Sequence, residues 1–106
     1  MNQVVLIGRL TRDVEVKKGS NGKAYAKVNI AIDRPGKDKE TDYPRVTIFG
    51  TQAENLAKYQ GKGSLIAIEG HVTTGSYEKD GSTAYTTDIV ADRAEFLSWN
   101  KESEEY

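Results

Sequence analysis

The chain has no cysteine, one histidine, one tryptophan and two prolines among its 106 residues. The lack of cysteine excludes disulfide bonds, cysteine-ligated zinc and thiol catalysis. No apolar run approaches the ~18 residues that a membrane-spanning helix requires, and no charged-then-apolar leader opens the chain. We therefore expect a cytoplasmic protein with no membrane segment, built as one domain whose core is large enough to fold without covalent cross-links.

The chain also has little excess of positive or negative charge. The formal net charge is −1, and residues 98–106, with one lysine and three glutamates, contribute −2, which leaves +1 for residues 1–97. Binding to a polyanion must therefore depend on where the cations lie. The one basic region spans residues 9–34, which contain three acidic side chains and seven cationic ones. The cationic residues are Arg9, Arg12, Lys17, Lys18, Lys23, Lys27 and Arg34. A solvated surface is the ordinary explanation of such a cluster.

Period-two alternation of β-branched residues in most segments predicts an all-β protein. Strands are expected at residues 4–10, 14–17, 24–32, 43–50, 65–77 and 84–91, with tight turns at Asn21-Gly22 and Asp80-Gly81. Residues 33–42 are polar throughout and predict an exposed loop. Residues 52–60 combine helix formers with apolar positions three and four apart, which predicts a short helix.

This order of segments matches a five-stranded OB-fold Greek-key barrel with one short α-helix between strands 3 and 4. An open sheet with one helix would give a similar order, so alternation alone does not prove closure. We expect residues 1–97 to form the OB-fold domain and residues 98–106 to form a short acidic tail.

The segment from Tyr43 to Phe49 carries the most informative surface pattern. Its non-core positions alternate Tyr43, Arg45, Thr47 and Phe49, and strand geometry separates the two rings by about 20 Å. Single-stranded nucleic acid offers flat bases and a charged backbone, so a surface that binds it needs rings interleaved with cations. A second apolar interface is the alternative interpretation, although a central arginine disfavours a dry contact.

Tyr77 is a similar candidate, because it precedes the Asp-Gly turn and is expected on a projecting arm. Its structural alternative is a cross-strand pair with Tyr85, and the two interpretations are compatible.

The sequence contains no convincing catalytic constellation, and we expect a protein that is not an enzyme and holds no metal or cofactor. His71 lies inside an apolar strand, where a structural role is more common than catalysis. Asp38, Glu40 and Asp42 lie in a loop with interspersed lysines and form a poor magnesium site. No phosphate-cradling glycine loop, nucleophile elbow or zinc spacing occurs.

Taken as a set, several short segments resemble the single-stranded DNA-binding proteins of bacteria and their phages. The resemblance covers residues 1 to 97 and is carried by residues 2–10, Asn21-Gly22, residues 46–50, residues 62–64, residues 68–70 and residues 85–87. It implies a homotetramer of OB folds that wraps single-stranded DNA and protects it during replication, recombination and repair.

The resemblance also implies roles for individual residues. Tyr43, Phe49 and Tyr77 match positions of base-stacking aromatics, two of which are usually tryptophan, and Arg45 and Lys62 match cations that hold phosphates. With the basic region, the expected DNA-binding residues are Tyr43, Arg45, Phe49, Tyr77, Lys62, Arg9, Arg12, Lys27 and Arg34.

The chain departs from the family pattern at three places. Residues 34–37 lack a stacking aromatic that is common there, and Val14 replaces a frequent proline. Family members generally continue into a long tail whose acidic tip recruits replication proteins. Residues 104–106 could be a reduced tip, but a frayed terminus is favoured, so we do not expect recruitment through it. An OB-fold protein-interaction module and an RNA-binding OB domain remain the alternative functions.

Overall fold

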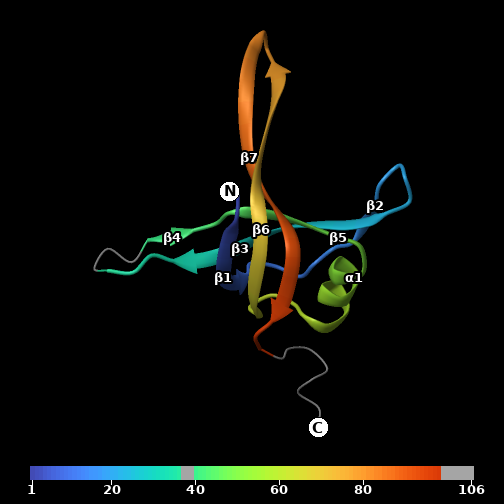
Figure 1. The fold of residues 1–106 in the computed structure, drawn as a ribbon, viewed down its shortest axis with the longest axis vertical. Coiled ribbons are helices and arrows are strands. Elements are labelled where there is room, and N and C mark those ends of the chain that lie inside the picture. The colour runs from blue at the N-terminus through green and yellow to red at the C-terminus, as the bar shows by residue number, and fades with distance from the viewer. Residues whose placement is uncertain (37–39, 99–106) are drawn as a thin grey trace.

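Five main strands and one helix build the protein (Figure 1). The computed structural model describes residues 1–36 and 40–98. The main strands are β1 (Val4–Leu10), β3 (Ala24–Asp33), β5 (Arg45–Phe49), β6 (Leu65–Lys79) and β7 (Ser82–Phe96), and the helix α1 (Gly50–Tyr59) joins β5 to β6. Two short strands, β2 (Lys17–Lys18) and β4 (Thr41–Asp42), pair with β3.

The main strands form a closed ring. Hydrogen-bonded neighbours follow the order β1, β6, β7, β5 and β3, and β1 returns to β3 through the pairs Arg9 with Ala31 and Leu10 with Ile30. The β5–β7 contact is parallel and the other contacts in the ring are antiparallel. This closure confirms the predicted OB-fold barrel and excludes the open sheet.

Alternation fills the barrel as the sequence predicts. Ala26, Val28 and Ile30 of β3 are buried, and so are the inward positions of β5 and β6. The helix packs Ala53 and Leu56, both fully buried, against this core. Burying an aliphatic side chain of this size contributes about 1.5–3 kcal/mol, so these strands hold the opposite, outward face on a rigid support.

Gly50 joins β5 directly to α1. Its φ of +70° lies in the left-handed region, where other L-residues are strained. Phe49 occupies the N-cap position with an extended backbone and makes no side-chain capping bond. The turn at Gly50 therefore fixes Phe49 at the end of the strand while its side chain stays 48% exposed.

Several helix and strand boundaries differ from the predicted ones. Strand ends depend on hydrogen bonding to a neighbouring strand as well as on the alternation of apolar residues. Of the strand predicted at residues 14–17, only Lys17 belongs to β2. Val14 packs against the core, but it does not pair with a neighbouring strand. The loop predicted at 33–42 contains β4, in which Asp42 pairs with Ile32. The helix begins at Gly50 rather than at residue 52. Apart from Ser98, the predicted acidic tail lies outside the described residues.

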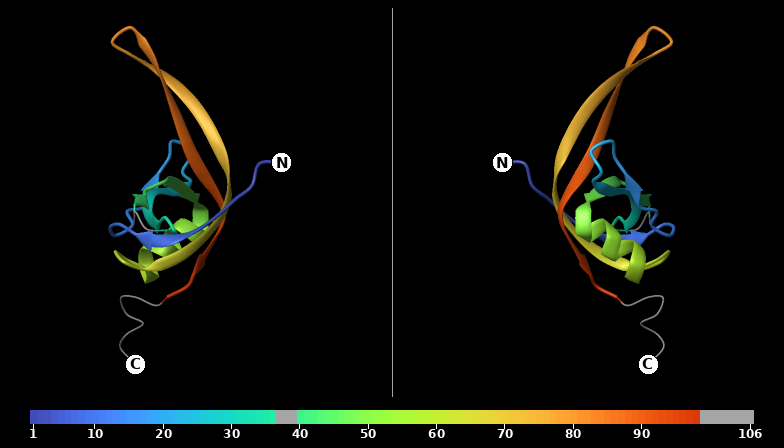
Figure 2. Two further views of the ribbon diagram at one scale, coloured as in Figure 1. Left: turned by 90° about the vertical axis from the view of Figure 1, so that its left-hand side faces the viewer. Right: turned by 90° about the vertical axis from the view of Figure 1, so that its right-hand side faces the viewer.

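The β6–β7 hairpin extends well beyond the ring as a curved two-stranded arm (Figure 2). Both strands have 15 residues, longer than predicted, and a turn with positive φ at Asp80 and Gly81 joins them. Two successive positive φ values are the geometry that an Asp-Gly hairpin favours, which confirms that turn.

Candidate nucleic-acid interface

The candidate interface is the outward face of β2, β3 and β5. Residues that pair directly across neighbouring strands share a face. The register therefore places Lys17, Tyr25 and Phe49 in one row across the three strands. Lys27 and Thr47 form the next row, and Asn29 and Arg45 form the one after it. The two rings thus share one row of this surface, and each of the three rows contains a cation.

Tyr25 and Phe49 form a pair of rings at one end of this face. Their centroids are 6.4 Å apart and their planes are tilted by 44°. Tyr25 is not among the DNA-binding residues expected from the sequence. Only the β3–β5 register brings it to Phe49, and that register is not visible in the pattern of either strand alone.

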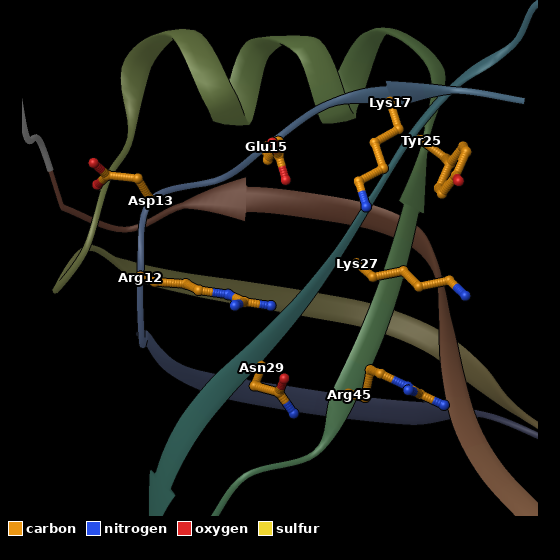
Figure 3. Close-up of a pocket in the computed structure, with 8 residues that line it drawn as sticks. All are labelled: Arg12, Asp13, Glu15, Lys17, Tyr25, Lys27, Asn29 and Arg45. Atoms are coloured by element: carbon orange, nitrogen blue, oxygen red, sulfur yellow. The ribbon is translucent and has the colours of Figure 1, made fainter.

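A cleft of about 380 Å³ is lined by Tyr25 of this ring pair (Figure 3). Arg12 and Lys17 reach into it from the segment before β3, while Lys27 and Arg45 extend in a common direction from β3 and β5. Its lining has four cationic and two acidic side chains and therefore carries a net positive charge. The lining residues are Arg12, Asp13, Glu15, Lys17, Tyr25, Lys27, Asn29 and Arg45. We call this the cation cleft. Its charge suits a phosphate group.

Arg45 is held in the cation cleft by Asp88 of β7. Arg45 Nε donates a hydrogen bond to Asp88 Oδ1 at 2.7 Å. This bond raises the pKa of Arg45 and lowers the pKa of Asp88, and nearby Lys27 lowers the pKa of Asp88 further. Asp88 therefore orients the guanidinium and cancels part of its charge.

Three other predicted cations lie outside the cation cleft. Arg34 forms two hydrogen bonds to Asp42, at 3.0 and 2.9 Å, which lower the pKa of that carboxyl. Arg9 Nη1 donates to the carbonyl of Gly63 at 2.9 Å. Lys62 has an exposed side chain. Arg34 is thus largely neutralised, and Arg9 is tied to the barrel.

Tyr43 lies just before β5 rather than within it, and its ring is 60% exposed. It lines a separate cleft of about 440 Å³ together with Arg9 and Ala31. Ala31 is the next outward position on β3 after Asn29. The side-chain amide of Asn29 donates a hydrogen bond to the Tyr43 carbonyl at 3.0 Å. Tyr43 and Phe49 therefore lie at opposite ends of the interface, with Arg45 between them.

Tyr77 and Tyr85 lie on opposite faces of the arm. Tyr77 pairs with Ala84, and Tyr85 pairs with Ser76, so the alternative interpretation of Tyr77 as the cross-strand partner of Tyr85 is wrong. A one-residue difference in register moves a side chain to the other face. Tyr77 alternates with Thr73, the partner of Asp88, and thus shares the face that carries Arg45.

The polar groups considered for catalysis have structural partners. His71 Nδ1 lies 3.2 Å from Asp92 Oδ2 on the partly exposed side of β6. Asp42 and Glu40 both contact Arg34, and Asp38 lies outside the described residues. Across residues 1–36 and 40–98, no three acidic or histidine side chains gather as a metal site, and no helix is long and apolar enough to cross a membrane.

A closed Greek-key barrel with rings and cations on its outward strands is typical of OB-fold proteins that bind oligonucleotides. The chain belongs to the single-strand binding protein family, whose model matches residues 1–97.

Several proteins similar to this chain are named single-stranded DNA-binding proteins. The chain is 48% identical over 110 residues to a single-stranded DNA-binding protein of Clostridium tetani, with 97% of this chain and 75% of that protein covered. It is 43% identical over 102 residues to one from Oceanobacillus iheyensis, with 92% and 63% covered. Single-stranded DNA-binding protein 2 of Clostridium acetobutylicum is 42% identical over 108 residues, with 97% and 81% covered. The chain therefore spans from about two thirds to four fifths of the length of these relatives.

Proposed function

We propose that this protein binds single-stranded DNA without reading its sequence, and that it protects and organises the strand during replication, recombination and repair. The observation that carries the proposal is the cation cleft on the face of the barrel that also holds the half-buried ring of Tyr25 and the exposed ring of Phe49. Family membership and the names of the relatives support it.

Binding is passive and combines two physical terms. Bases stack on exposed rings, of which Tyr43, Phe49 and Tyr77 are the main candidates, and each stack contributes ~1–3 kcal/mol. Tyrosine and phenylalanine offer less ring area than tryptophan, so each stack falls toward the low end. Phosphates in the cation cleft add a term that weakens with salt, because binding releases condensed counterions. Neither term depends on base identity.

A homotetramer would join four such surfaces. The outward side chains of β1 support contact between copies, because Val5 and Ile7 are 64% and 53% exposed on a strand that pairs with β6 along residues 4–9 and with β3 only at Arg9 and Leu10. Linking several modest sites on one strand converts them into tight wrapping.

Titration of labelled oligo-dT, followed by fluorescence anisotropy, tests the DNA-binding function. Four phosphate contacts per protomer predict that log K falls with log salt at a slope of about −3. Oligo-dT should bind more tightly than a duplex of the same length. No signal change would favour a protein-interaction module, and tighter binding of oligo-U would favour an RNA-binding domain.

Two further measurements test the remaining parts. Light scattering after size exclusion, with and without a long oligonucleotide, tests the homotetramer. Incubation of labelled strands with Mg²⁺ tests the absence of nuclease activity, since cleavage would contradict passive binding.

A further inference from the structure

We propose that Tyr25 is an additional base-stacking residue and that, with Phe49, it forms a subsite for one nucleotide between two clefts. This inference rests on the proposed DNA-binding function and adds to it a residue and a position for the base and its phosphate.

The first step is the geometry of the rings. Tyr25 and Phe49 pair directly across β3 and β5, and their tilt of 44° opens an angle between the ring planes. A flat base cannot lie parallel to both rings at that angle. It can stack on one ring and meet the other with its edge, and both arrangements between π systems are favourable. The pair is therefore suited to a single base rather than to two bases stacked in succession.

The second step is the position of Tyr25 between two clefts that are both bordered by cations. On one side, Tyr25 lines the cation cleft. On the other side, it lines a cleft of about 330 Å³ formed by the turn at residues 19–23, Thr47 and Phe49. Lys27 also borders both clefts. Lys23 borders the second cleft as well, and none of its described lining residues is acidic. The rings of Tyr25 and Phe49 are therefore flanked by cations, which suits a base on the rings and phosphates beside it.

The third step is preorganisation of the outer wall. Three hydrogen bonds hold the turn at residues 19–23: Gly19 N–H donates to the Lys23 carbonyl at 2.9 Å, Gly22 N–H donates to the Gly19 carbonyl at 2.9 Å, and Lys23 N–H donates to Asn21 Oδ1 at 3.0 Å. A wall that is already ordered lowers the entropic cost of binding. The cleft beside Phe49 thus has a fixed shape before DNA arrives.

Photocrosslinking of the wild-type protein tests the contact directly. Oligo-dT with 5-iododeoxyuridine in place of one thymidine is bound, irradiated and digested, and the adducts are located by mass spectrometry. We expect an adduct on Tyr25 as well as on the other interface rings. This readout uses the native chain and does not depend on the folding of any variant.

Affinity measurements separate stacking from support of Phe49. Tyr25→Leu keeps an apolar side chain beside Phe49 but removes the π face. For an oligo-dT of about eight nucleotides, within the ~4–16 nucleotides that one OB fold binds, we expect a loss of ~5- to 140-fold, the equivalent of ~1–3 kcal/mol. The salt slope should stay unchanged, because no charge is removed. In a Phe49→Leu background, Tyr25→Leu should still weaken binding several-fold.

Tyr59→Leu is the matched control, since Tyr59 is 40% exposed on α1 and lines neither of the two clefts. Normal oligo-dT binding with no adduct on Tyr25, or a Tyr25→Leu effect that vanishes without Phe49, would overturn this proposal alone. Failure of the wild-type protein to bind oligo-dT would overturn the proposed function first.

Discussion

Arg45 and Asp88 form an ion pair inside the candidate interface, with 2.7 Å between Nε and Oδ1. The Arg45 side chain remains 46% exposed and the Asp88 side chain 25% exposed. The pair uses one edge of the guanidinium, so the other nitrogens stay available to a phosphate. Asp88 therefore positions Arg45 for DNA and at the same time repels the approaching backbone.

Asp88→Asn should strengthen DNA binding. The substitution keeps the side-chain shape and removes the negative charge beside Arg45. Both side chains of the pair are partly exposed to solvent, so the electrostatic effect is small and we expect affinity for oligo-dT to rise by at most about fivefold at low salt. The gain should shrink as salt increases, because screening weakens exposed charges. Asp80→Asn, at the tip of the arm, makes the same change in net charge. An equal effect of both substitutions would show that only net charge matters.

Acid should remove the contribution of Asp88 to stability. Arg45 lowers the pKa of Asp88 in the folded state below its ordinary value of 3.8. A carboxyl with a lowered folded pKa stabilises the fold above its unfolded pKa and loses that effect as pH falls through the folded pKa. Urea unfolding of wild type and Asp88→Asn should therefore differ near about pH 6 and converge well below pH 3.8. A difference that persists in acid would assign the effect to packing.

Lys27 and Arg34 should contribute unequally to phosphate binding. Lys27 lines the cation cleft and forms no salt bridge within the described parts of the chain, whereas Arg34 is paired with Asp42. We expect Lys27→Gln to weaken oligo-dT binding and to reduce the magnitude of the salt slope by ~0.7, the value of one phosphate contact on single strands. Arg34→Gln should leave the slope nearly unchanged. A larger effect of Arg34→Gln would move the DNA path toward β4.

The barrel could be predicted because its information is local. Alternation of apolar residues indicates a core face at Ala26, Val28 and Ile30. Two-residue sequences indicate the turns at Asn21-Gly22 and Asp80-Gly81. The outward exposure of Arg45 and Phe49 follows from the same alternation, and the structure confirms it.

The ring pair and the arm could not be predicted in this way. Tyr25 meets Phe49 only through the β3–β5 register, and Tyr77 is separated from Tyr85 by one residue of register in the β6–β7 hairpin. Register depends on the whole set of cross-strand contacts and on the turn that joins the strands. Asp88 was missed as well, because its effect on Arg45 requires the parallel contact between β5 and β7.

Replacing Gln60 should stabilise the barrel. The Gln60 side chain is fully buried at the end of α1, and neither its Nε2 nor its Oε1 has a hydrogen-bond partner among the described residues. A buried unsatisfied polar group costs ~1–3 kcal/mol. We expect Gln60→Met, a similar shape without the amide, to add ~1 kcal/mol and to raise the melting temperature by ~4–8 °C, measured by circular dichroism.

Ser64→Ala is the contrasting variant. Ser64 is also buried, but its Oγ accepts a hydrogen bond from Gly61 N–H at 3.1 Å. Removing the hydroxyl leaves that donor unsatisfied, so Ser64→Ala should lower the melting temperature. Equal effects of the two substitutions would indicate that the Gln60 amide has a partner in solution. DNA binding should change in neither variant.

Tyr77 and Tyr85 provide a matched pair for locating the DNA on the arm. Both rings are exposed, Tyr77 by 52% and Tyr85 by 81%, yet only Tyr77 shares the face that carries Arg45. A base–aromatic stack contributes ~1–3 kcal/mol, so Tyr77→Ala should weaken binding of a long oligo-dT by ~5- to 140-fold, measured by fluorescence titration. Tyr85→Ala should have little effect, although its ring is the more exposed of the two. Greater loss in Tyr85→Ala would place the strand on the opposite face of the arm and separate Tyr77 from the interface on the barrel.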